Sequence, residues 1–232
     1  MALDCRSGEA ALELVGRLGD APVAMMKVGS ELFTATGPEL VRKLRSQGHR
    51  VFLDLKFHDI PNTVAGAAAA SARLGIAMLN VHASGGVAMM RAARQAAVEA
   101  APGVLVIAVT LLTSLDQQDL ARLGLTCSPG EQVLRLADMA AKAGLDGVVA
   151  SPAEVAELRR SFPPPFLLVA PGIRPAWAGE AGDQRRLATP GEAIAAGADF
   201  IVVGRPITRA PDPREAALRV IEEIASAESP KI

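Results

Sequence analysis

The chain is poor in aromatic residues: it has six phenylalanines, one tryptophan and no tyrosine. Proteins that bind single-stranded nucleic acid stack the bases on aromatic side chains, so this shortage argues against such a platform. The chain also lacks an excess of either charge, because 24 lysines and arginines face 25 aspartates and glutamates. Binding to a phosphate backbone needs a basic surface, and a net charge of -1 gives no support for it.

The sequence also shows no cysteine pattern typical of disulfides, no long apolar run and no pattern typical of a signal peptide. Cys5 and Cys127 lie far apart and form neither a C-x-x-C pair nor a disulfide framework. The longest uncharged stretches, 74–90 and 100–115, are shorter than the roughly 20 apolar residues of a membrane span. The first residues show no basic region followed by an apolar run, so we expect no signal peptide. These absences favour a cytoplasmic protein with neither a nucleic-acid nor a membrane partner.

Half of the residues are hydrophobic, and many of them gather in short apolar or β-branched runs. Such runs are typical of parallel strands that are covered on both faces. We expect strands at 23–28, 51–56, 76–82, 104–110, 147–150, 166–170 and 200–203. Residues 1–4 fit a clipped first strand.

Helical patterns separate these runs. Apolar residues recur at helical spacing in three places: Ala11, Leu14, Val15 and Leu18; Val133, Leu136, Ala137 and Ala140; and Ala217, Val220, Ile221 and Ile224. Three helix starts combine a hydroxyl N-cap, a proline and a capping-box glutamate: Ser128–Glu131, Ser151–Glu154 and Thr189–Glu192. Glycines that suit a helix end precede the next strand at Gly48, Gly75, Gly103, Gly144 and Gly197.

The unit of strand, loop, helix and glycine therefore repeats about eight times, at roughly 29 residues each. This repetition predicts a single α/β domain over residues 1–232, a (β/α)₈ TIM barrel with its active site at the C-terminal ends of the strands. A doubly wound sheet is the alternative, because a local pattern does not show whether the sheet closes. No G-x-G-x-x-G follows the first strand, which weakens a dinucleotide-binding fold.

Charged residues lie where the expected strands end, although a parallel strand buried on both faces should carry no charge without a reason. They are Asp4, Lys27, Asp54, Lys56 and Arg205. One such residue would usually be only the start of a solvated loop, but five at corresponding places indicate a site. Alternation along a strand puts Asp54 and Lys56 on one face, pointing into the barrel mouth, with Asp59 in the following loop. Two carboxylates around one ammonium favour a fixed proton donor, although a structural salt-bridge cluster would use the same residues.

The segment from Asp54 to Thr63 reads DLKFHDIPNT and resembles the signature of the orotidine 5′-phosphate decarboxylase family. The similarity extends along nearly the whole chain. Further matching pieces are Ala2–Asp4, Lys27–Gly29, Asn80–Gly86, Val109–Ser114, Pro171–Pro175, Gly182–Arg186 and Val203–Arg205. Any one tripeptide is weak, but the D-x-K-x-x-D core in register with the other pieces is specific.

The resemblance implies a role for each matching residue. Lys56 would donate a proton to C6 of the pyrimidine as carbon dioxide leaves, Asp54 would lie against the departing carboxylate, and Asp59 would come from the partner subunit of a homodimer. The substrate-binding residues would be Asp4, Lys27, Ile60, Thr63, Thr113, Arg174, Gln184, Gly204 and Arg205. Among these, Lys27 would bridge a ribose hydroxyl and the acidic residues. The last four of these residues would hold the phosphate.

No cofactor is expected, since no spacing of histidine, aspartate and glutamate resembles a metal site. Two alternatives to this function stay open. Magnesium-dependent sugar-phosphate barrels, of the 3-hexulose-6-phosphate synthase or 3-keto-gulonate-6-phosphate decarboxylase type, share the D-x-K-x-x-D strand. They hold the metal partly through an acidic second strand, whereas here that strand ends in Lys27, which would repel it. The other alternative is a barrel that binds phosphate without catalysis.

Overall fold

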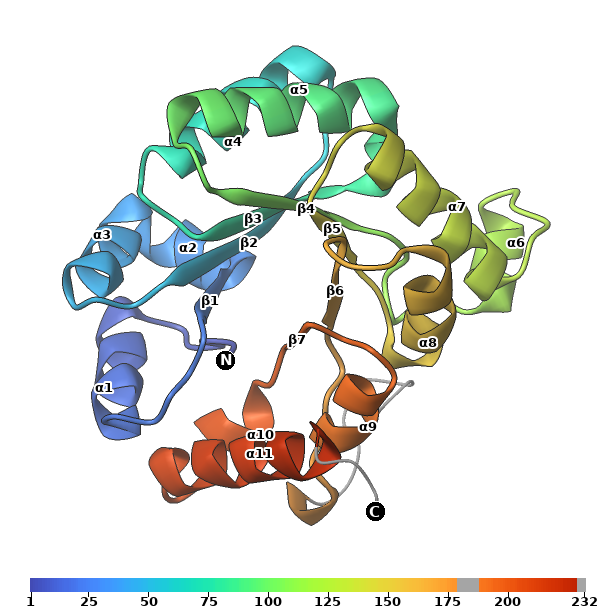
Figure 1. Ribbon diagram of the computed structural model, residues 1–232. Helices are drawn as coiled ribbons and strands as arrows, with labels where there is room; N and C mark the ends of the chain where they lie inside the picture. Colours follow the sequence, from blue (N-terminus) through green and yellow to red (C-terminus); the bar gives the residue numbers. More distant parts are fainter. Residues whose placement is uncertain (179–187, 229–232) are drawn as a thin grey trace.

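The computed structural model of the chain describes residues 1–178 and 188–228. Its centre is one parallel sheet in which each strand pairs with the next along the chain (Figure 1). The strands are β1 Met26–Gly29, β2 Val51–Phe57, β3 Met78–His82, β4 Leu105–Val109, β5 Gly147–Val149, β6 Leu167–Ala170 and β7 Phe200–Ile201. A doubly wound sheet would reverse its strand order at a switch point. The strictly sequential order therefore excludes that alternative.

Helices surround the curled sheet on its outer side (Figure 1). They are α1 Gly8–Leu18, α2 Ser30–Thr36, α3 Pro38–Ser46, α4 Pro61–Ala72, α5 Gly86–Ala100, α6 Gln117–Arg122, α7 Pro129–Lys142, α8 Pro152–Ser161, α9 Pro190–Ala195, α10 Arg205–Thr208 and α11 Pro213–Glu228. Two short 3₁₀ turns, η1 Ala83–Gly85 and η2 Ala176–Ala178, follow β3 and β6. Within the described part of the chain, none of these helices is long and apolar enough to cross a membrane.

The expected first strand is reduced to a single bridge between Ala2 and Lys27 of β1. On one side, the Leu3 N–H donates to the Lys27 carbonyl at 2.9 Å. On the other side, the Ala2 N–H donates to the carbonyl of Val203, just past β7, at 2.8 Å. This N-terminal segment thus joins the first and last strands of the sheet. The barrel prediction is confirmed, with its first strand clipped as expected.

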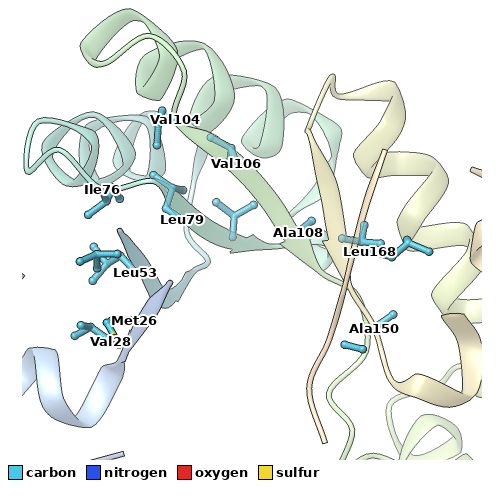
Figure 2. Packing of buried hydrophobic residues seen from close by; sticks show 14 of the residues in the cluster. Met26, Val28, Leu53, Ile76, Leu79, Val104, Val106, Ala108, Ala150 and Leu168 are labelled. Carbon is cyan, nitrogen blue, oxygen red and sulfur yellow. The ribbon is translucent and has the colours of Figure 1, made fainter. Parts of the chain in front are cut away.

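Two groups of buried side chains cover the two faces of the sheet. Between the strands and the helices lies the larger group, which includes Leu53, Leu79, Val106 and Leu168 (Figure 2). Residues one position away point to the opposite face, since side chains alternate along a strand. There, a second cluster contains Met25, Phe52, Met78, Ile107 and Val169. It fills the interior of the barrel below the charged strand ends.

The helix predictions hold with two exceptions. The buried residues of α1 and α7 are those that the periodicity singled out, whereas Ile221 and Ile224 of α11 are only half-buried. Capping boxes form at the starts of α7 and α9. The prediction of a capping box at α8 was wrong. The Ser151 hydroxyl accepts from the Ala153 N–H, and Glu154 is buried. The five helix-ending glycines all have positive φ.

A repeated device ties neighbouring units of the barrel together. Asp146, just before β5, accepts the Val106 N–H of β4 at 2.7 Å and pairs with Arg94 of α5 at 2.8 Å. Asp199, just before β7, accepts the Leu168 N–H of β6 in the same way and pairs with Arg159 of α8. Each carboxylate therefore accepts the N–H of the neighbouring strand and pairs with an arginine of the helix that precedes that strand. These contacts fix the strands at the end opposite the site.

Candidate active site

A cleft of about 600 Å³ opens at the carboxyl ends of the strands. Eight residues that the sequence analysis assigned to the site line it together: Asp4, Lys27, Asp54, Lys56, Thr113, Arg174, Gly204 and Arg205. They come from the N-terminal segment, from β1 and β2, and from the loops after β4, β6 and β7. The fold thus brings residues from distant parts of the sequence to one site, as expected of a barrel.

Asp54 is the centre of the charged group in this cleft. Its Oδ1 lies 2.6 Å from Lys56 Nζ, and its Oδ2 lies 3.0 Å from Lys27 Nζ. Asp4 stands at the far side of Lys27, with Oδ1 3.9 Å from Nζ. Lys27 and Asp54 have side chains about a tenth exposed, while Lys56 is 35% exposed. Of the two ammonium groups, that of Lys56 is therefore the more open to a ligand.

The two ammonium groups decide the charge state of Asp54. Burial opposes ionisation of this carboxyl, but Lys27 and Lys56 attract the anion and the Asn80 amide donates to it. The pKa of Asp54 therefore lies below its ordinary value. At neutral pH the cleft therefore holds a carboxylate fixed between two ammonium groups.

β2 does not keep the plain alternation that the sequence analysis assumed. Its pairing with β3 shifts between Leu53, which faces Leu79, and Phe57, which faces Val81. Lys56 has φ of 54°, and no other non-glycine residue of the described chain has a positive φ. Left-handed backbone at a lysine costs free energy and is found where function requires it. The bulge, rather than regular alternation, aims Asp54 and Lys56 at each other.

Asn80 belongs to the site, although the sequence analysis gave it no role. It lies in β3 and is 1% exposed. Its side-chain oxygen accepts the Lys56 N–H at 2.8 Å, and its nitrogen donates to Asp54 Oδ1 at 2.7 Å. One signal was available, because a buried strand rarely carries an asparagine without partners for its amide.

Gly204 packs closely against Asp4. A Cβ built on Gly204 would lie 2.7 Å from Asp4 Oδ2, closer than real Cβ contacts come. Arg174 is held through a bond from its guanidinium to the Ala178 carbonyl at 2.7 Å. Gln184 lies outside the described residues.

Three predicted site residues do not reach the cleft within the chain. Asp59, Ile60 and Thr63 are exposed at the start of α4, and none of them lines the cavity. The Asp59 carboxylate accepts the N–H of Ile60 at 2.6 Å. Within one chain, the cleft therefore contains Asp54 and Lys56 of the predicted Asp-Lys-Asp array but not Asp59.

The donor set in the cleft does not suit a divalent cation. Both oxygens of Asp54 are in contact with ammonium groups, and Lys27 stands between Asp54 and Asp4. A cation at either carboxylate would meet this positive charge at close range. In the part of the chain that the structure describes, no cluster of three or more histidine, cysteine, aspartate or glutamate side chains forms a metal site.

Known proteins resemble this chain over almost its full length. The model of the Orotidine 5′-phosphate decarboxylase / HUMPS family matches residues 1–220. The orotidine 5′-phosphate decarboxylase of Syntrophotalea carbinolica is 53% identical and covers 97% of this chain and 94% of its own. That of Escherichia coli is 52% identical, with coverage of 93% and 87%.

Solved structures agree with the sequence relatives. The crystal structure of orotidine 5′-phosphate decarboxylase from Lactobacillus acidophilus has a TM-score of 0.85 and 42% identity, and the match covers 96% of both chains. The corresponding structure from Pyrococcus horikoshii has a TM-score of 0.76 at 28% identity. The chain thus shares the curled parallel sheet and much of its sequence with these enzymes. The chain belongs to the orotidine 5′-phosphate decarboxylase family.

Proposed function

We propose that this chain decarboxylates orotidine 5′-phosphate to uridine 5′-phosphate, with Lys56 as the proton donor. The chain is a carboxy-lyase, and the reaction is a step of pyrimidine biosynthesis. The observation that carries the role of Lys56 is its position. Its ammonium lies 2.6 Å from a buried carboxylate, while its side chain is about a third exposed and lines the cleft.

The reaction breaks the bond between C6 of the pyrimidine and its carboxylate. The electron pair of that bond stays on C6 while carbon dioxide leaves. The proton on Lys56 Nζ then moves to C6, and the neutral amine regains a proton from water. A positioned ammonium stabilises the charge that develops on C6 and serves as the general acid. Asp54 holds the ammonium in place and lies against the departing carboxylate.

The phosphate of the substrate binds at the other end of the cleft. Arg205 and Arg174 offer planar guanidinium groups that match phosphate oxygens, and Gly204 lets its backbone N–H approach the anion. Gln184 completes this grip. Lys27 and Asp4 bind the ribose, and Thr113 bonds to the pyrimidine. Binding energy from the phosphate holds the distant ring against Lys56.

Each site takes Asp59, Ile60 and Thr63 from a second copy of the chain. These residues belong to the family motif, yet within the chain they are exposed and outside the cleft. A homodimer with two-fold symmetry would present the start of α4 to the partner's cleft, and each chain would complete the other.

The proposed reaction uses neither metal nor organic cofactor, because Lys27 and Lys56 already supply the positive charge at Asp54. It takes place in the cytoplasm, where phosphorylated nucleotides are retained by their charge.

The test follows the ultraviolet absorbance of orotidine 5′-phosphate before and after dialysis of the enzyme against EDTA. We expect the rate to be unchanged by dialysis. Lys56→Ala should lower it on the order of 10³-fold or more, while uridine 5′-phosphate still binds. Activity that needs added magnesium would favour the sugar-phosphate reaction instead. Near-normal turnover of Lys56→Ala would remove this lysine from the mechanism.

A further inference from the structure

We propose that Asn80 is a positioning residue for the decarboxylation: its amide holds Lys56 in the β2 bulge and aligns Asp54 with the Lys56 ammonium. This inference rests on the proposed role of Lys56. It assigns to a buried side chain of β3 the task of aiming the proton donor that β2 carries.

The two hydrogen bonds of Asn80 go to different parts of the catalytic pair. Its side-chain oxygen accepts from the backbone N–H of Lys56 at 2.8 Å, and its nitrogen donates to Asp54 Oδ1 at 2.7 Å. The orientation of the amide is fixed by its partners, because a backbone N–H only donates and an ionised carboxylate only accepts. Both ends of the amide are therefore in use.

The place of Asn80 in the sheet explains why these bonds matter. Leu53 pairs with Leu79 and Phe57 pairs with Val81. Residues 54–56 thus all lie opposite the single residue Asn80, and the β2–β3 ladder offers them no regular partners, although Asp54 still pairs with Gly29 of β1. The Asn80 side chain supplies the acceptor that the Lys56 N–H would otherwise lack. It stabilises the left-handed backbone of Lys56, which has φ of 54° and is unfavourable for a residue with a Cβ.

Asp54 Oδ1 accepts from both Asn80 and Lys56, at 2.7 and 2.6 Å. The asparagine and the ammonium therefore converge on one oxygen, and the remaining oxygen is left to Lys27. If Asn80 is removed, Asp54 is free to turn and Lys56 is free to leave the bulge. A shift of the ammonium by about 1 Å is enough to lower turnover on the order of 100-fold.

Asn80→Asp is the most informative variant because it preserves shape and changes the proton. An aspartate still accepts the Lys56 N–H, but when ionised it repels Asp54. Once the two carboxylates, that of the variant at position 80 and that of Asp54, share a proton, the resulting O–H joins them by a hydrogen bond as the Asn80 amide did. The other groups that face this pair are Lys27, Asp4 beyond it, Lys56 itself and His82 at the end of β3.

The experiment measures kcat, KM and the dissociation constant of uridine 5′-phosphate between pH 5 and 8. For Asn80→Asp we expect kcat to be lowered about 100-fold at pH 8. The ratio of variant to wild-type kcat should rise as the pH falls, while product affinity stays within about twofold. Asn80→Leu, of similar size, should show the loss at every pH. Thr110→Val is the control, since Thr110 is also a buried polar residue at a neighbouring strand end but bonds only to the Val149 carbonyl.

The possible failures are distinguishable. If Lys56→Ala is inactive but both Asn80 variants keep kcat within about twofold, the positioning role is wrong and the role of Lys56 stands. A loss for Asn80→Asp that is the same at every pH, with weakened product binding, would make Asn80 a substrate contact or a merely structural residue. If Lys56→Ala is active, the proposed function itself fails, and with it the purpose assigned to Asn80.

Discussion

Replacing Asp54 by asparagine should destabilise the protein, because this carboxylate contacts two ammonium groups of the cleft at once. At 3.0 Å, the attraction between Asp54 and Lys27 is about 5 kcal/mol at an effective dielectric constant near 20. The contact with Lys56 counts for less, since that side chain is 35% exposed and water screens it. Desolvation of the carboxylate, which is 8% exposed, offsets part of this gain.

Removal of one partner from a buried pair costs about 3–5 kcal/mol in general. Because Lys56 is partly solvated and an asparagine still accepts the bond from Asn80, we expect about 2–3 kcal/mol for Asp54→Asn. The assay is urea denaturation at one protein concentration, with unchanged m-values as the sign that only stability differs.

The pH dependence of this difference follows from the lowered pKa of Asp54. A carboxyl with a lower pKa in the folded state stabilises the fold above its unfolded pKa, near 3.9. That contribution is lost as the pH falls through the folded value. The difference in the free energy of unfolding between wild type and Asp54→Asn should therefore be largest at pH 7 and should decrease below about pH 4.

The control is Asp20→Asn, which breaks the exposed pair with Arg214 and should change stability much less. If Asp54→Asn were as stable as the wild type at pH 7, or if the gap did not depend on pH, the carboxylate would not be held by its two cations in the way described.

Three further experiments test the other parts of the site. Arg205→Ala should strongly lower kcat/KM for orotidine 5′-phosphate and leave kcat/KM for the unphosphorylated nucleoside almost unchanged. Equal losses of kcat/KM for both substrates would make Arg205 a structural residue. Gly204→Ala should raise KM, because its Cβ would lie 2.7 Å from Asp4 Oδ2; an unchanged KM would show that Asp4 moves without consequence. Mixing Lys56→Ala with Asp59→Ala should restore roughly a quarter of the sites if the dimer shares them, and no recovery after verified subunit exchange would place Asp59 in its own chain's site.

The parts of the fold that follow from local chemistry could be predicted from the sequence. Glycines at 48, 75, 103, 144 and 197 need positive φ at helix ends, and each has it. The apolar periodicity of α1 and α7 matches their buried faces residue by residue. These signals lie within a few residues of the features they specify, so no tertiary information was needed.

Features that depend on neighbouring strands could not be predicted in the same way. The bulge in β2 arises because Asn80 of β3 satisfies the backbone of Lys56, a contact between residues 24 apart in the sequence. Regular alternation correctly predicted that Asp54 and Lys56 lie together. It wrongly assumed a regular strand, since the pairing of β2 with β3 shifts between Leu53 and Phe57. Local patterns also did not predict that Asp59 and Ile60 are exposed, and neither residue lines the cleft in the part of the chain that the structure describes.

Closure of the barrel and assembly of the site depend on the same few residues. Lys27 pairs through its backbone with the N-terminal segment and through its side chain with Asp54. The segment that bridges β1 and Val203 ends at Asp4, whose carboxylate occupies the space that a side chain at Gly204 would need. The clipped first strand therefore does more than complete the sheet. It sets the distance between the charged group and the end of the cleft at Gly204, so substitutions that loosen this strand should disturb substrate binding before they unfold the protein.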